Sequence, residues 1–169
     1  MQILQKLKAL LGMAKGGTYN FRSIKKSDLT AIMEIETQVY DYPWSEQIFK
    51  DCLRVGYRNW AFIKGGQFIG YAITSVAVGE AHILNICITP ACQKKGLGRV
   101  FLNMLFSVME KEQVNCIFLE VRPSNLSAIK LYQTMGFKKI GQRKNYYRHA
   151  DGKEDAWVYS LDLPVAQIE

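Results

Sequence analysis

Apolar and polar residues alternate at 19–24, and this period of two predicts a β-strand, while short apolar runs further along the chain, such as 116–121, predict buried strands. The predicted strands are residues 19–24, 60–63, 68–76, 81–89, 116–121, 138–143 and 156–161. Two of them flank Lys64-Gly65-Gly66-Gln67, a glycine turn that predicts a β-hairpin.

Between these strands the apolar residues follow helical spacing. Ser27 precedes Leu29, Ile32, Met33, Ile35 and Val39, so we expect a helix with Ser27 as its N-cap. Pro43-Trp44-Ser45 then ends one helix and caps the next, and further helices are expected over 97–112 and from Ala128. Strand–helix–strand units that follow a meander predict an α/β fold of the mixed α+β kind, with helices on both faces of one sheet.

The first 17 residues differ from the rest, because they combine leucine and isoleucine at helical spacing with interleaved lysines. We therefore divide the chain into a basic amphipathic leader, 1–17, and a single domain, 18–169. The leader is expected to be a frayed or self-packed terminal helix tethered by Gly16-Gly17. The alternative is a helix that lies on a membrane or on a partner.

The chain carries a formal net charge of +7, which favours acidic partners such as a polyphosphate ligand, RNA or an anionic membrane. The sequence has no RNA-binding motif, so nucleic acid is not expected as a substrate. No apolar run approaches the roughly 20 residues of a membrane span. The four cysteines lack paired CxxC spacing and only two histidines occur, so no metal site is expected and reduced thiols indicate a cytoplasmic protein.

The stretch from Asn85 to Arg99 is the strongest candidate for binding chemistry. A predicted strand ends at Thr89-Pro90, and a helix begins near Leu97 after a loop that holds Gly96, Gly98 and three cations. A glycine-rich helix start offers N–H groups and a favourable dipole to an anion. The spacing fits neither the GxGxxG fingerprint nor the GxxxxGK[ST] loop. The structural alternative is a relaxed turn with a solvated basic edge.

The segment Gln93-x-x-Gly96-x-Gly98 resembles the pyrophosphate loop of the GNAT acetyltransferases. Residues 119–137, "LEVRPSNLSAIKLYQTMGF", resemble the second half of the GNAT core. "YPWSE" at 42–46, "RKNYY" at 143–147 and "DGKEDA" at 151–156 are similar to the ribosomal-protein-alanine N-acetyltransferases of the RimI type. The resemblance extends over about 20–163 with the motifs in family order.

This resemblance implies the GNAT fold, a central mixed and mostly antiparallel sheet of about seven strands with about four helices on both faces. It implies transfer of acetyl from acetyl-CoA to the α-amine of an N-terminal alanine on a small-subunit ribosomal protein. Acetyl-CoA is then the cosubstrate, no metal is needed, and the N-terminal peptide is the partner of a monomer or weak dimer. The alternatives are a GNAT enzyme that acetylates a lysine or a small amine, and a non-catalytic module that binds acyl-CoA or associates with RNA.

The resemblance also implies roles for particular residues. Glu120 is the expected general base, directly or through a water, and Tyr132 the expected general acid. The expected cofactor-binding residues are Ile86, Cys87, Ile88, Lys94, Lys95, Gly96, Leu97, Gly98, Arg99, Asn125 and Tyr132. The expected acceptor residues are Tyr42, Trp44, Arg143, Asn145, Tyr146 and Tyr147.

Each role has a structural alternative. Glu120 can be a strand-end carboxylate paired with Arg122 or Lys130, and Tyr132 can be a core aromatic. Asn125 can cap the helix that follows it. The acceptor residues can be core and rim packing. Cys87 has no local base partner, so we expect no covalent acyl-cysteine.

The acceptor type can be argued from pKa values. An α-amine has a pKa of ~7.7–8.0 and a lysine ~10.4, so near pH 7.4 deprotonating the lysine costs ~3 kcal/mol more. One glutamate as base therefore suits an α-amine better than a lysine.

Overall fold

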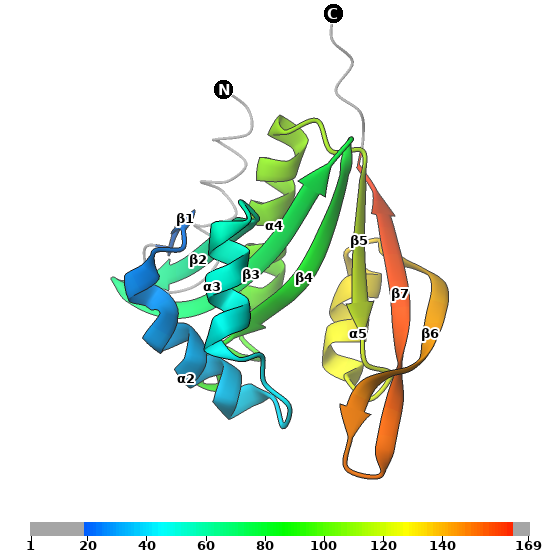
Figure 1. Cartoon of the computed structure of the whole chain (residues 1–169). Helices are drawn as coiled ribbons and strands as arrows, with labels where there is room; N and C mark the ends of the chain where they lie inside the picture. Colours follow the sequence, from blue (N-terminus) through cyan, green and yellow to red (C-terminus); the bar gives the residue numbers. More distant parts are fainter. Residues whose placement is uncertain (1–18, 164–169) are drawn as a thin grey trace, which may run out of the picture. The chain divides into compact units, whose positions relative to one another are not determined.

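The structure is a computed structural model that describes residues 19–163, so the predicted leader lies outside the described residues. It contains one seven-stranded sheet in the order β1-β2-β3-β4-β5-β7-β6 (Figure 1). The strands are β1 (Tyr19–Ser23), β2 (Arg58–Lys64), β3 (Gln67–Ala77), β4 (Glu80–Ile88), β5 (Cys116–Val121), β6 (Lys138–His149) and β7 (Gly152–Asp162). The α-helices among the described residues are α2 (Leu29–Val39), α3 (Glu46–Arg54), α4 (Leu97–Lys111) and α5 (Leu126–Thr134). The sheet is mixed, with β4 and β5 parallel and the other registered pairs antiparallel. The predicted fold class is confirmed.

The chain forms two compact units. The first comprises residues up to Thr74 together with Asn85–Val108, and the second comprises Ser75–Leu84 together with the residues from Met109 onward. We describe each unit by itself. The prediction of a single domain over 18–169 stays a prediction.

In the first unit, helices pack on both faces of the β1–β2–β3 strands (Figure 1). One face forms a core with α2 and α3 in which Ile32, Phe49 and Tyr71 are almost fully buried. On the other face, Phe101 of α4 stacks on Phe62 with ring centroids 4.7 Å apart. Alternation along β2 therefore sends neighbouring residues into two separate apolar layers.

In the first unit, the predicted glycine turn and the Ser45 cap are confirmed, and the Ser27 cap is not. Gly65 and Gly66 have φ values of +53° and +83°, as the predicted two-residue hairpin turn requires. Ser45 is the N-cap of α3, as predicted, and its Oγ accepts from Ile48 N at 3.4 Å. The predicted Ser27 cap is wrong, because residues Lys26–Asp28 form a 3₁₀ turn and α2 begins after Asp28. Asp28 binds the guanidinium of Arg22 at 2.7 Å instead.

In the second unit, β5 pairs with the first half of β4 on one side and with β7 on the other. The β6–β7 hairpin is longer than the predicted 138–143 and 156–161, since polar residues up to His149 keep pairing with β7. Two register shifts interrupt this pairing, at Lys139/Gly141 and at Arg143/Tyr147. The second shift is a β-bulge that turns the backbone next to Tyr146 and Tyr147.

Candidate active site

The glycine-rich loop of the first unit connects β4 to α4. A single 3₁₀ turn, Pro90–Cys92, follows the strand, and Gln93 Nε2 donates to Ile88 O at 2.8 Å. Gly96 has a φ of +77°, a conformation that favours glycine, and α4 begins at the next residue. The first N–H groups of a helix have no acceptor within the helix, so this start can receive an anion.

Three exposed cations surround this helix start. Lys94 lies in the left-handed region with a φ of +57°, and Lys95 Nζ donates to Ala91 O at 2.7 Å. Arg99 lies in the first turn of α4. The predicted loop residues are thus adjacent, and together they give a positive, glycine-lined helix start that suits a pyrophosphate.

The second half of β4 holds the three residues expected to contact the cofactor through their backbone. Tyr40 donates to Ile86 O at 3.4 Å. A Cβ at Gly70 would lie 2.6 Å from Cys87 O, so β3 and β4 approach closely only because residue 70 is glycine. Burial raises the pKa of the Cys87 thiol to about 12, which agrees with the expectation that it is not a nucleophile.

The segment between α2 and α3, residues 40–45, carries two predicted acceptor residues. Tyr42 is 43% exposed, while Trp44 is half-buried and its ring packs against Phe49 at 5.5 Å. Trp44 N donates to Glu36 Oε1 at 2.8 Å. Sequence reasoning missed Glu36, although it stands seven residues after Leu29 and four after Ile32, on the buried stripe of α2.

In the second unit, Glu120, the expected general base, lies near the end of β5. Its carboxylate is 2.8 Å from Arg143 Nε and accepts a hydrogen bond from Tyr146. The two alternative partners named above are therefore wrong, since Arg122 pairs with Glu154 at 3.2 Å and Arg143 takes the place expected of Arg122 or Lys130. Burial is the largest cause that raises the pKa of Tyr146, and the hydrogen bond to Glu120 raises it further. Glu120, Arg143 and Tyr146 thus form one contact group.

Helix α5 and its N-cap hold two further predicted residues of this unit. Tyr132 is 7% exposed and its ring meets that of Phe137 edge-on at 5.6 Å. Asn125 Oδ1 accepts from Ala128 N at 3.1 Å, so Asn125 caps α5 as its structural alternative predicts.

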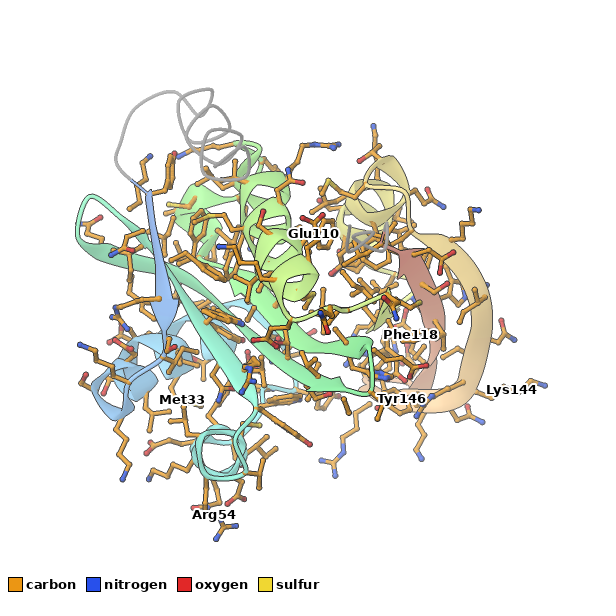
Figure 2. The ribbon with its side chains drawn as sticks, turned by 90° about the horizontal axis from the view of Figure 1, so that it is seen from above. Met33, Arg54, Glu110, Phe118, Lys144 and Tyr146 are labelled. Atoms are coloured by element: carbon orange, nitrogen blue, oxygen red, sulfur yellow. The ribbon has the colours of Figure 1, made fainter. Side chains whose placement is uncertain are left out.

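The bulge in β6 carries the remaining predicted acceptor residues. Asn145 has a φ of +53°, and its N–H donates to Asp155 Oδ1 at 2.9 Å. The Arg122 guanidinium lies 4.3 Å from the centre of the Tyr147 ring. Figure 2 labels Lys144 and Tyr146 on this strand, where Lys144 extends outward from the hairpin.

A second carboxylate, that of Glu154, links the hairpin to the residues that follow β5. Glu154 accepts from Ser124 N at 2.8 Å and from Arg122 at 3.2 Å. Burial opposes ionisation of Glu154, but these hydrogen bonds outweigh it and lower the pKa of the carboxyl. Arg122 therefore joins Tyr147 and Glu154, and this arrangement fixes the bulged part of the hairpin.

Residues 19–163 contain no group of three or more His, Cys, Asp or Glu side chains placed to hold a metal. Nor does any helix in this part of the chain have the length and apolar character needed to cross a membrane.

Comparison with known proteins identifies the family. The sequence pattern of the acetyltransferase (GNAT) family matches residues 28–137. The chain is 39% identical over 141 residues to the [ribosomal protein bS18]-alanine N-acetyltransferase of Escherichia coli K12, covering 83% of this chain and 95% of that protein. The crystal structure of the E. coli ribosomal-protein-S18-alanine N-acetyltransferase superimposes with a TM-score of 0.81 at 36% identity, over 90% of this chain and 99% of that one.

A more distant structure, Arabidopsis thaliana NAA60 in complex with acetyl-CoA, has a TM-score of 0.77 at 18% identity, over 86% of this chain and 99% of that one, and shares the fold. Acetyl-CoA is the acetyl donor that the family uses. With the glycine-rich helix start and the ordered motifs, these matches show that the chain is an N-acetyltransferase that belongs to the GNAT family.

Proposed function

We propose that this enzyme transfers the acetyl group of acetyl-CoA to the α-amine of the N-terminal alanine of ribosomal protein bS18. The observation that supports this most is the 39% identity to an enzyme named for that reaction, over 83% of this chain and 95% of the relative. The motifs at 42–46 and 143–147, which resemble the same enzymes, support the acceptor side of the proposal.

For the cofactor we assign the residues of the first unit. Lys94, Lys95, Gly96, Leu97, Gly98 and Arg99 hold the pyrophosphate through backbone N–H groups and positive charge. Ile86, Cys87 and Ile88 offer their backbone to the amide-rich pantetheine arm, in the manner of strand addition. In the second unit we assign Asn125 and Tyr132 to the same ligand, although Asn125 already caps α5.

The chemical step needs three events. The amine nitrogen attacks the thioester carbonyl, the amine loses a proton, and the carbon–sulfur bond breaks to give a thiolate. We assign Glu120 as the base that takes the proton, directly or through a water. We assign Tyr132 as the acid that protonates the thiolate, a step that is modestly uphill because a thiol has a pKa of ~8.5 and a phenol ~10.

For the acceptor we assign Tyr42 and Trp44 in the first unit, and Arg143, Asn145, Tyr146 and Tyr147 in the second. Arg143 and Tyr146 contact Glu120, so an incoming ammonium group meets a carboxylate that is already held by a cation and a hydroxyl. We place the enzyme in the cytoplasm as a monomer or weak dimer. The four free cysteines agree with a reducing compartment.

The test is intact-mass measurement of three peptides incubated with the full chain and acetyl-CoA. The first is the bS18 N-terminal sequence with a free alanine, the second has a blocked terminus, and the third has a blocked terminus and one added internal lysine. We expect one acetyl group on the first peptide and none on the others. Acetylation of the blocked lysine peptide at the rate of the free one would contradict the N-terminal assignment.

A further inference from the structure

Glu36 is a buried carboxylate that the proposed chemistry does not use. Its side chain stands in the apolar core of the first unit, where the residue is only 1% exposed. The other buried residues of α2 are Leu29, Ile32 and Ile35, all apolar. Burial of a carboxyl group costs free energy unless hydrogen bonds satisfy its oxygens.

Three donors from three different segments converge on this carboxylate. Trp44 N donates to Oε1 at 2.8 Å, and Asn85 Nδ2 donates to the same oxygen at 3.4 Å. The hydroxyl of Tyr71 donates to Oε2. No ion pair among residues 19–163 includes Glu36, so hydrogen bonds rather than a cation hold its carboxyl group in place.

The three segments are those that carry predicted site residues or adjoin them. Trp44 belongs to the 40–45 segment, Asn85 immediately precedes the cofactor residues of β4, and Tyr71 follows Gly70 on β3. A further hydrogen bond joins the 40–45 segment to β4, since the hydroxyl of Tyr40 donates to Ile86 O at 3.4 Å.

The ring of Trp44 is held as well as its backbone. It packs on Phe49 at 5.5 Å, and Phe49 meets the ring of Tyr71 edge-on at 5.5 Å. Ring contacts therefore link Trp44 through Phe49 to Tyr71, whose hydroxyl donates to Glu36. Pro43 has no backbone N–H, so the Trp44 amide is the first backbone donor that follows the proline.

We propose that Glu36 is a positioning residue that fixes the 40–45 segment against β3 and β4 and so determines how well the enzyme holds its peptide acceptor. Glu36 acts through Tyr42 and Trp44, and it takes no part in proton transfer. The proposal rests on the proposed function in one respect, the identity of the acceptor used to measure binding.

The first test measures the Trp44 amide directly in the wild-type chain. NMR-detected hydrogen exchange should show this amide strongly protected, although it lies outside any helix or strand. An amide at position 44 that exchanges as fast as an exposed loop would overturn the proposal. This measurement needs no substrate, so it separates the positioning role from the choice of acceptor.

The second test compares Glu36→Leu with Glu36→Gln. Leucine fits an apolar core but accepts no hydrogen bond, whereas glutamine keeps an oxygen for the Trp44 amide. Glu36→Leu should lose the protection of Trp44 and raise the KM for the alanine peptide about ten- to hundredfold, with an unchanged Kd for acetyl-CoA. Glu36→Gln should keep the protection and a KM near that of the wild type.

The matched control is Asp28→Asn at the other end of α2, which weakens the contact to Arg22 and leaves the 40–45 segment alone. It should lower thermal stability without changing the peptide KM. Equal losses of peptide and acetyl-CoA binding in a folded Glu36→Leu would overturn the proposal, as would a wild-type peptide KM. If the wild type fails to acetylate the peptide but Trp44 is protected as described, the proposed acceptor fails and the positioning role remains.

Discussion

The close approach of β3 to β4 leads to a prediction about Gly70. A Cβ at this position would lie 2.6 Å from the carbonyl oxygen of Cys87 and 3.3 Å from Ile88 Cα. Both atoms are backbone, so no side chain can rotate away to make room. Gly70→Ala must therefore move one strand relative to the other.

The size of the effect follows from the cost of overpacking. One methyl group forced against a well-packed core costs typically 1–3 kcal/mol. Since the total stability of a domain is about 5–15 kcal/mol, the variant should still fold. The melting temperature of a chain of this size should fall by roughly 2–4 °C for each kcal/mol lost.

The displaced carbonyl belongs to the strand that we assign to the pantetheine arm. Loss of one hydrogen bond of ordinary strength, ~0.5–1.5 kcal/mol, corresponds to an affinity loss of about two- to tenfold. We expect Gly70→Ala to show both effects, a lower melting temperature in a thermal scan and weaker acetyl-CoA binding in calorimetric titration.

Gly66→Ala is the matched control. Its φ of +83° makes alanine strained there, but a Cβ would meet nothing within 4 Å. It should cost ~1–2 kcal/mol of stability and leave acetyl-CoA affinity unchanged. A Gly70→Ala variant with wild-type stability would refute the steric reasoning, and one that is destabilised but binds acetyl-CoA normally would refute the assignment of the strand.

Four further outcomes are expected. Glu120→Gln and Tyr132→Phe should each keep acetyl-CoA affinity and lower turnover ~10²–10⁴-fold, and Glu120→Gln should flatten the acidic limb of the pH–rate profile; near wild-type rates across the pH range would remove the assigned base. Gly98→Val should weaken acetyl-CoA binding in a folded protein, and unchanged affinity by calorimetry would exclude the pyrophosphate loop. Deletion of residues 1–17 should leave peptide acetylation nearly unchanged, and a large loss in a folded truncation would show that the leader completes the enzyme. Burial raises the pKa of Glu36, so the folded state keeps the carboxyl proton to higher pH than the unfolded chain, in which the pKa of this group is near 4.5. The free energy of unfolding should therefore fall as pH rises through the folded pKa, and urea unfolding of Glu36→Gln should show a smaller decline over that range.

The sequence predicted the parts of the fold that depend on local chemistry. The Gly65-Gly66 hairpin and the Ser45 cap depend on a few adjacent residues, so they could be located without tertiary information. The extent of β6 could not, because its polar second half is a strand only through pairing with β7. Ser27 was a reasonable cap by residue type, but Asp28 holds the N-cap position of α2, and its carboxylate binds Arg22, a contact that local spacing does not show.

The resemblance supplied the candidate site residues, whereas the contacts that hold them could not be predicted from the sequence. The resemblance names Glu120, but only the folded hairpin brings Arg143 to it across a bulge. Glu36 escaped because a glutamate interrupts an apolar pattern, and its three donors come from positions 8, 35 and 49 residues further along the chain. Such partners are set by sheet topology, which local patterns do not contain.

The boundaries of the two compact units fall inside secondary structure, at Thr74 within β3, at Leu84 within β4 and at Val108 within α4. A fragment cut at any of these points would leave half a strand or an uncapped helix, and each unit consists of two separate pieces of chain. The units therefore do not correspond to continuous segments of chain, and we expect split-reporter or circularly permuted versions to fold better when they are opened at hairpin tips. The β6–β7 hairpin, which runs from Lys138 to Asp162, is one continuous piece of chain that carries all the residues that we assign to the acceptor in the second unit, so exchange of this hairpin is a direct way to test for a changed acceptor preference.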